Sequence, residues 1–368
     1  MFPSAQFKER IFHQFFPPPR FLEVPVVGLA ISDNAISAIE LVRNKGAFAV
    51  GRFGRRVLPP GILSLGYIHN KDAVIEELRK LKDSLKLDFV NASLSEEKAY
   101  LFRTKIPRVP QKEIRGVLEF KLEENVPIPA SDAIFDYTVI TQAGHDTSDH
   151  LDVGVTVLPK KVVDTYVEVL DAVNITPLSF ETEAQAISRA IIGRGDEDTY
   201  LVVNIGETKT GLFIVSDEVV HFTSSIAIGG ADITKAIAKH LSVSVEEAAN
   251  IKQKHTVFKS KKNLDLFLLL MNAVSVLKDE VRKLSVYWNT HGDAPGEIGK
   301  KISKIILCGH DSGLTGFAEY LSQVLQSKVE AGNVWRNAFS FEEYIPPILF
   351  DESLDYAAAV GLALPKGH

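Results

Sequence analysis

The hydrophobic positions of this chain alternate between strand-like and helix-like spacing, and their order predicts an α/β protein. Apolar and β-branched runs at residues 26–31, 36–42 and 47–55 predict three strands joined by short polar turns. Apolar residues then recur at helical spacing over 72–85. Two further apolar runs, at 89–94 and 98–102, predict strands. The first hundred residues therefore indicate a sheet with a helix packed on it.

The middle of the chain carries a helix, two strands and a second helix. Residues 111–125 place Ile114, Val117, Leu118 and Leu122 on one helical face. Strands are predicted at 135–142 and 151–158, and a helix from 159 to about 173. The proline-containing stretch 105–110 precedes this unit, and a strand at 177–180 and a helix at 181–192 follow it. We expect a compact α+β subdomain inserted between pieces of a larger domain.

The second half centres on the stretch from 199 to 234, where strands are predicted at 200–205, 211–215 and 219–228. The turn Gly206-Glu207-Thr208-Lys209-Thr210 joins the first two strands, and its N–H groups and hydroxyls suit phosphate oxygens. An ordinary β-meander with a polar turn has the same pattern. Helices are predicted at 231–241, 245–254, 264–288, 315–325 and 356–364. A strand at 304–307 leads through Gly309 into the fourth of these helices, and such a corner can receive an anionic ligand.

Residues 1–21 differ in composition from the rest. Phe7, Ile11, Phe12, Phe15 and Phe16 recur at helical spacing until Pro17. We expect a short amphipathic helix that packs on its own domain or docks on a partner, with a membrane surface as the third alternative.

Length and charge narrow the class of protein. A chain of 368 residues is long enough for two or more lobes. The net charge of −6 argues against a general nucleic-acid binder, because no basic excess is available to neutralise phosphates. Cys308 is the only cysteine, so an internal disulfide is excluded, and its apolar neighbours predict a core strand residue. No apolar run is long enough to span a bilayer, and we expect a cytoplasmic protein.

Several phrases carry a family resemblance. They read V-V-G-L-A-I-S-D-N-A-I-S-A-I-E-L at 26–41, I-P-R-V-P-Q-K-E-I-R-G-V-L-E-F-K-L-E-E-N-V-P-I-P at 106–129, F-T-S-S-I-A-I-G-G-A-D-I-T at 222–234 and D-Y-A-A-A-V-G-L-A-L at 355–364. In this order they resemble the PilM family of type IV pilus assembly, within the actin-like ATPase superfamily and related to FtsA. The resemblance implies an actin-like ATPase (ribonuclease H-like) fold of two lobes, with an inserted α+β subdomain of the FtsA/PilM type.

The resemblance also implies a division of the chain. Residues 1–21 form an N-terminal extension. Residues 22–104, completed by 179–198 and 350–368, form the core of the first lobe, with the inserted subdomain at 105–178. Residues 199–230 and 303–349 form the core of the second lobe, and 231–302 its helical upper part.

A nucleotide cleft between the lobes is a further implication, with ATP and Mg²⁺ as cofactors. The matching positions are Ser32, Asp33, Asn34, Gly206, Glu207, Thr208, Thr210, Gly229, Gly230, Lys252, Glu280, Lys283, Gly309 and His310. Glu183 matches a glutamate that the family places near the attacking water.

The chain departs from the family at the two aspartates that hold magnesium, because Ala30 and Asn204 stand in their places. Magnesium prefers carboxylate oxygens, so Asn204 and the nearby Asp33 are the remaining metal candidates. We expect a degenerate cleft that does not hydrolyse ATP. A working ATPase or ATP-gated switch is the alternative.

The function that the resemblance implies is that of a scaffold in type IV pilus or competence-type assembly, at the inner face of the cytoplasmic membrane. Its partner would be the N-terminal tail of a PilN-like inner-membrane protein, held in a groove lined by Ile114, Val117, Leu118 and Tyr137. Other inner-membrane pilus proteins and self-association are further candidates. An FtsA-like filament-forming membrane tether is a third alternative for the function.

Overall fold

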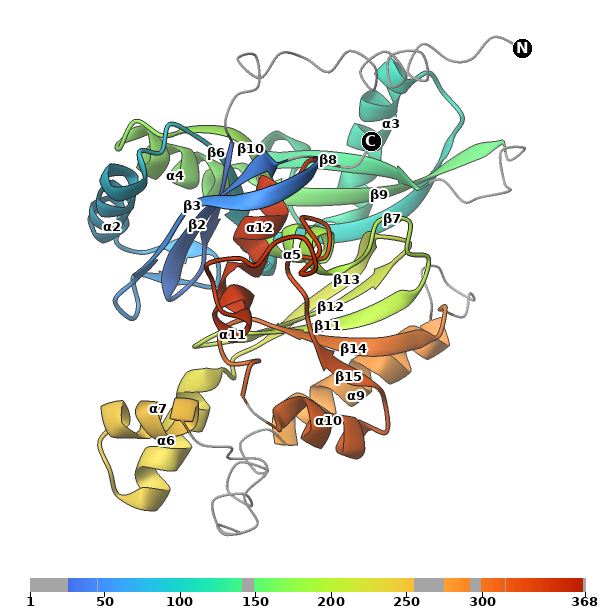
Figure 1. Ribbon diagram of the computed structural model, residues 1–368. Coiled ribbons are helices and arrows are strands. Elements are labelled where there is room, and N and C mark those ends of the chain that lie inside the picture. The colour runs from blue at the N-terminus through green and yellow to red at the C-terminus, as the bar shows by residue number, and fades with distance from the viewer. Residues whose placement is uncertain are drawn as a thin grey trace.

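The computed structural model describes residues 26–44, 46–140, 149–254, 275–291, 299–314 and 316–366. It shows a mixed α/β protein with two five-stranded sheets, a three-stranded sheet and a short two-stranded sheet formed by β4 (Leu63–Ser64) and β5 (Tyr67–Ile68) (Figure 1). The amphipathic helix predicted in 1–21 lies outside the described residues. So does the first part of the helix predicted at 264–288, whose described part is α9 (Ser275–His291).

The first lobe is built on a five-stranded sheet of order β10-β6-β1-β2-β3. β1 pairs antiparallel with β2 and parallel with β6, while β2–β3 is antiparallel and β6–β10 parallel. The bounds are Val27–Ile31 for β1, Ala35–Asn44 for β2, Ala47–Val57 for β3, Phe89–Leu94 for β6 and Thr176–Thr182 for β10.

The second lobe repeats this arrangement in a sheet of order β13-β12-β11-β14-β15. β11 pairs antiparallel with β12 and parallel with β14, as β1 does with β2 and β6. The bounds are Thr199–Ile205 for β11, Thr210–Ser216 for β12, Val219–Ile226 for β13, Ile302–Cys308 for β14 and Val329–Ala331 for β15. Because the two sheets share one topology, the β1–β2 turn and the β11–β12 turn are counterparts.

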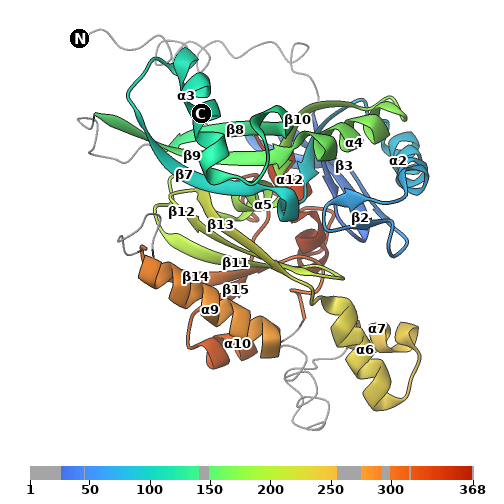
Figure 2. The same cartoon turned by 180° about the vertical axis from the view of Figure 1, so that it is seen from behind.

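Two helices, α5 (Glu183–Ile191) and α12 (Ala357–Ala363), lie between the two sheets (Figures 1 and 2). Their small and apolar residues form one core with Ala30 and Ile39 of the first sheet and Val202 and Phe213 of the second. This core joins the lobes to each other.

The outer faces of the sheets are covered separately. α2 (Lys71–Leu85) and α4 (Lys160–Asp171) cover the first sheet, where β1 contributes its alternate residues Val27, Leu29 and Ile31. α6 (Gly230–Leu241), α9 and α10 (Phe317–Leu325) contribute to the core on the outer face of the second sheet. α6 and α7 (Val245–Lys254) pack on each other and project from the second lobe (Figure 2).

The inserted unit lies between β6 and β10. Its sheet has the order β7-β9-β8, formed by β7 (Tyr100–Pro107), β8 (Ala133–Ile140) and β9 (His150–Pro159), and α3 (Gln111–Asn125) packs on it. The strand expected at 98–102 starts later and continues to Pro107, because β7 is an edge strand that tolerates a proline at its end. The division of the chain into subdomains at the boundaries given above stays a prediction.

Glycines permit the close approach of α12. A Cβ on Gly361 would lie 1.7 Å from the Ala186 carbonyl oxygen of α5, and one on Gly28 of β1 would lie 1.9 Å from the Ala359 carbonyl oxygen. Backbone therefore packs directly on backbone at the centre of the molecule, where a single methyl group has no room.

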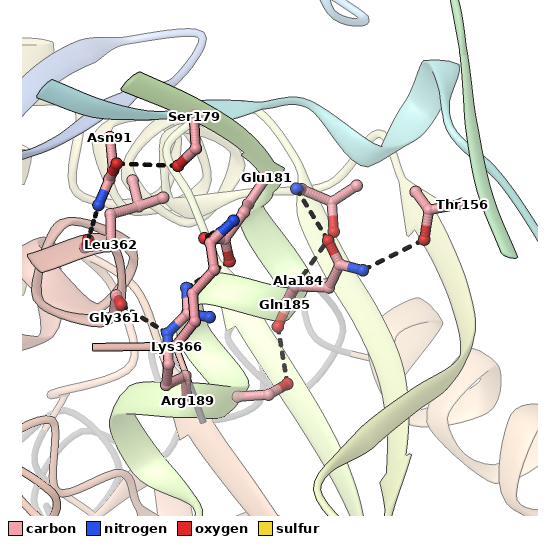
Figure 3. Close-up of polar contacts among 12 residues, drawn as sticks. Asn91, Thr156, Ser179, Glu181, Ala184, Gln185, Arg189, Gly361, Leu362 and Lys366 are labelled. Atoms are coloured by element: carbon pink, nitrogen blue, oxygen red, sulfur yellow. Dashed lines mark hydrogen bonds and ion pairs between the residues drawn. The ribbon is translucent and has the colours of Figure 1, made fainter. Parts of the chain in front are cut away.

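Polar side chains then fix the C-terminal end of α12, whose last carbonyl groups lack partners within the helix. Arg189 Nε donates to the Gly361 carbonyl at 2.8 Å, and Asn91 Nδ2 donates to the Leu362 carbonyl at 2.9 Å (Figure 3). Asn91 is itself held by Ser179, and Arg189 by an ion pair with Glu181. The helix end is thus tied to α5 and to the first sheet.

Replacing Gly361 by alanine should destabilise the fold strongly, because the added methyl group would overlap the backbone of α5. We expect a loss of about 3 kcal/mol or more in the free energy of unfolding, measured by urea denaturation. Gly116→Ala in α3 is the matched control, because a Cβ there meets nothing within 4 Å. It should be neutral or stabilising by up to about 1 kcal/mol. Equal stability of the two variants would contradict the packing described here.

Candidate functional site

A cleft open to solvent lies between the turns that follow β1 and β11. From the first sheet, the β1–β2 turn and the segment after β6 line the cleft. From the second sheet, the β11–β12 turn and the loop after β14 line it. Residues of α5 and of the C-terminal segment complete the lining. Of the residues predicted for the site, the lining contains Ser32, Asp33, Asn34, Glu183, Asn204, Gly206, Glu207, Thr208, Gly309 and His310.

The two turns are joined across the cleft through Asp33. Thr208 Oγ1 donates to Asp33 Oδ2 at 3.2 Å, and the ammonium group of Lys209 lies 3.4 Å from Asp33 Oδ1. Lys209 also lies 2.5 Å from Glu97 Oε1 and donates to Ser95 Oγ at 3.1 Å. Asp33 is mostly buried, and burial raises its pKa although Lys209 and Thr208 oppose this. Asp33 is the carboxylate nearest in sequence to Ala30, which stands where the family has a metal-binding aspartate. This carboxylate is therefore already bound by residues of the second lobe.

Acidic side chains surround Lys209. Burial and the neighbouring Glu183 raise the pKa of Glu96 to about 8. Burial also raises the pKa of Glu183, against the charge of Lys209 and a 3.5 Å hydrogen bond from Asn204 Nδ2. Burial disfavours the charged form of Lys209, but the surrounding carboxylates outweigh it and raise its pKa. The cleft thus holds one ammonium group among four carboxyl groups, those of Asp33, Glu96, Glu97 and Glu183.

A second bridge crosses the cleft at His310. Its Nδ1 lies 2.9 Å from Asp355 Oδ1, and Arg55 Nε of β3 lies 3.7 Å from Asp355 Oδ2. The hydrogen bond to Asp355 raises the pKa of His310. Ser37, the short residue on β2, donates to the Asp355 carbonyl at 3.5 Å. The loop after β14 is therefore connected to the first lobe through one carboxylate.

Gly309 supports this loop through its backbone. Its φ of +88° suits glycine, and a Cβ would lie 2.5 Å from the Ile205 carbonyl oxygen. The loop can therefore approach the end of β11 only with glycine at this position.

Two predicted residues, Lys252 and Gly230, pack together outside the cleft lining. Lys252 forms a buried ion pair with Asp311 at 2.5 Å and donates to the Gly230 carbonyl at 3.2 Å. A Cβ on Gly230 would lie 1.5 Å from Asp311 Oδ2, so this carboxylate fills the space above the start of α6. The predicted nucleoside-binding residue Lys252 is thus engaged with a carboxylate of the protein.

The remaining predicted ligands have structural partners. Thr210 is buried and donates to the Ile228 carbonyl at 2.7 Å, and the Gly229 N–H donates to Asp232 at the start of α6. Glu280 and Lys283 pair with each other on the surface of α9, at 3.4 Å. Helical residues three apart make such contacts without any ligand.

The residues predicted for a partner groove divide into two kinds. Ile114 and Leu118 of α3 are buried in the core of the inserted unit, so they are not available to a partner in this structure. The helical spacing that selected them is the signature of that core. Val117 and Tyr137 are only partly buried and lie at the margin of the same core.

Sequence reasoning missed the residues that dominate the electrostatics of the cleft. Lys209 lies within the predicted phosphate turn, and Glu96 and Glu97 follow the strand β6 after one residue, Ser95. Side chains at the carboxyl ends of neighbouring strands meet at one edge of a sheet, and this rule could have identified both. The role of Asp355 had no comparable signal, because its contacts with Arg55 and His310 are remote in sequence.

Comparison with known proteins identifies the family. The model of the family "Type IV pilus assembly protein PilM" matches residues 28–366. This chain is a member of the PilM family. Among solved structures, it is similar to a PilM–PilN type IV pilus biogenesis complex, with a TM-score of 0.75 and 21% sequence identity over 94% of this chain and 98% of that one.

Two further structures resemble this PilM-family protein in fold. The ethanolamine utilization protein EutJ from Carboxydothermus hydrogenoformans has a TM-score of 0.54 and 15% identity over 94% of this chain and 90% of that one. MreB5 of Spiroplasma citri bound to ADP has a TM-score of 0.52 and 13% identity over 92% and 94%. The predicted actin-like fold is confirmed. Within the described residues, no helix combines the length and the apolar character needed to cross a membrane.

Glu96 should make stability depend on pH. Its pKa rises from the ordinary 4.5 to about 8, so the folded protein keeps a proton that the unfolded chain has lost. Its contribution to stability therefore falls as pH rises from about 4.5 to 8. Glu96→Gln, which imitates the protonated acid, should be about 1–3 kcal/mol more stable than wild type at pH 8.5 and equal to it near pH 5.

Urea denaturation of both proteins across this pH range checks the expectation. Glu123→Gln on the exposed face of α3 serves as the control and should show no such trend. If the Glu96→Gln variant is less stable than wild type at pH 8.5, the ionised carboxylate of Glu96 stabilises the folded protein, and the expectation is wrong.

Proposed function

We propose that this PilM-family protein is a cytoplasmic scaffold of a type IV pilus or competence-type assembly machine, with a degenerate nucleotide cleft. It acts at the inner face of the cytoplasmic membrane through a PilN-like inner-membrane partner. Contacts with other inner-membrane pilus proteins and with further copies of itself belong to the same role. The observation that carries the proposal is the direct bridge from Thr208 and Lys209 to Asp33, which joins the two turns of the cleft through protein groups alone.

ATP with Mg²⁺ is the cofactor that the fold implies, since the similar MreB5 structure is described as bound to ADP. The residues of this cleft do not fit it. Ala30 offers no side-chain oxygen to a metal ion, and Asn204 offers a neutral amide that already contacts Glu183. Asp33 is engaged by Lys209. Positions 30 and 204 therefore offer no carboxylate to magnesium, and the nearby carboxylate of Asp33 is already paired with Lys209.

Electrostatics also disfavours a triphosphate. The carboxyl groups of Asp33, Glu96, Glu97 and Glu183 outnumber the one lysine at the point where the turns meet. Those carboxyl groups that are ionised repel phosphate oxygens at such short range in a partly buried site. On the nucleoside side, the Lys252–Asp311 pair packs against Gly230. Both ends of the family's nucleotide site are thus filled by interactions within the protein.

The partner surface lies at the inserted subdomain. Within the described residues, β8 is an edge strand of the three-stranded sheet, and no described strand pairs with one side of its backbone. An extended peptide can add to such an edge through backbone hydrogen bonds, with side chains in neighbouring pockets. Val117 of α3 and Tyr137 of β8 are partly exposed at the margin of the core of the inserted unit. The likeness of this chain to a solved PilM–PilN complex supports a PilN-like tail as that peptide.

The full chain should show no binding of ATP tighter than about 1 mM by calorimetry, with or without Mg²⁺, because Ala30 and Asn204 offer no carboxylate to the metal ion and the two turns are bridged internally. Its melting temperature should not change with either ligand. Magnesium-dependent binding tighter than about 10 μM would replace this proposal by the ATP-operated switch.

Val117→Asp should weaken binding of a synthetic peptide with the N-terminal tail of the PilN-like protein from the same organism. A charge at this partly buried position opposes an apolar tail, and we expect a loss of at least about tenfold in affinity by fluorescence anisotropy. Glu119→Gln is the control, because residues two apart on a helix face different ways. Equal affinity of Val117→Asp and wild type, with unchanged melting, would place the tail elsewhere.

A further inference from the structure

Lys209 extends from the second lobe into an acidic wall of the first. Its ammonium group lies 3.1 Å from Ser95 Oγ, 2.5 Å from Glu97 Oε1 and 3.4 Å from Asp33 Oδ1. An ammonium group has three N–H donors, and three oxygen atoms of the first lobe surround this one. The side chain is mostly buried, so the contacts are shielded from solvent.

The carboxyl groups around Lys209 form the kind of wall that elsewhere holds a metal ion. Glu183 and Glu96 complete it, and Glu96 is buried with one carboxyl oxygen that has no hydrogen-bond partner in the described part of the chain. Carboxyl groups this close repel each other when ionised, so some keep a proton, as Glu96 does, or a positive charge lies among them. Besides such protonation, a hard divalent cation or a lysine ammonium group can compensate the charge of ionised carboxylates.

We infer that the ammonium group of Lys209 is the resident cation of the cleft, replacing a divalent metal ion and holding the two lobes together without nucleotide. The inference rests on the proposed degenerate cleft and explains how that cleft stays closed. Ala30 and Asn204 carry no charge, and Lys209 brings a positive charge to the cleft as part of the chain. A tethered cation costs no binding entropy, so closure is independent of ATP and metal concentration.

The inference predicts that removal of the Lys209 side chain creates a binding site for a divalent metal ion. In Lys209→Ala the ammonium group and its stem are gone, and the carboxyl groups of Asp33, Glu96, Glu97 and Glu183 remain around an empty space. The variant should bind Mn²⁺ with a dissociation constant below about 1 mM, measured on the full chain by the loss of the free-ion electron paramagnetic resonance signal. Wild type should show no binding in this range, because the lysine charge repels the ion.

Stability should follow the same logic. Lys209→Ala should melt roughly 5 °C lower than wild type without metal, because an uncompensated acidic cluster remains. Both Mn²⁺ and n-propylammonium, which carries the atoms that the substitution deletes, should restore part of this loss. Propylammonium should also compete with Mn²⁺, whereas n-propanol should do neither, since it fills space without charge.

Two control variants make the result specific. Lys300→Ala removes another paired lysine, bound to Asp217 outside the cleft, and should gain no Mn²⁺ binding. Lys209→Ala with Glu97→Gln removes a carboxylate from the wall and should lose the gained binding by at least about tenfold. If Lys209→Ala does not fold, Lys209→Gln, which keeps most of the stem, should show the same gain.

The outcomes separate this inference from the proposed function. If wild type binds no ATP and neither Lys209 variant binds Mn²⁺ or melts differently from wild type, the degenerate cleft stands and the resident cation is wrong. Binding of Mn²⁺ by wild type as tightly as by the variants would overturn the inference as well. Magnesium-dependent ATP binding by wild type would overturn the proposed function first.

Discussion

The contact between α12, α5 and β1 is the constraint on which the rest of the structure depends. At Gly361 and Gly28 the backbones approach so closely that no side chain fits between them. The two sheets are held on either side of these helices, and their counterpart turns therefore face each other across a fixed distance. Arg189 and Asn91 then secure the end of α12 against α5 and the first sheet. Packing therefore joins the lobes at a place separate from the polar groups of the cleft.

Within that frame, electrostatics decides what the cleft can hold. Lys209 and Thr208 reach Asp33 from the opposite turn, and His310 reaches Asp355. Each of these contacts joins the second lobe to the first or to the C-terminal segment between them. Breaking one partner of a mostly buried pair leaves the other charge uncompensated, which is costly. The closed arrangement is thus supported by the protein's own charges, in a fold whose relatives include a nucleotide-bound protein.

Periodicity was sufficient to predict most of the fold. The buried strands β1 and β11 and the helix α3 show clear spacing, because burial on one or both faces imposes a pattern on local sequence. Family resemblance located the two turns of the cleft. It could not show that Lys252 pairs with Asp311, or that Lys209 is drawn into the first lobe, because both contacts join residues far apart in sequence. Ile114 and Leu118 illustrate the converse, since an apolar helical face predicts burial better than it predicts a binding surface.

The repeated strand order has a consequence for how the two halves of the chain can differ. The β1–β2 turn and the β11–β12 turn occupy equivalent places in sheets of one topology, and they meet each other. If both turns carried the same charged residue at the point of contact, two carboxylates or two ammonium groups would face and repel each other. A carboxylate on one turn and an ammonium group on the other remove that conflict. Because the two turns contact each other directly, they need different residues at this point, although the sheets around them share the same topology.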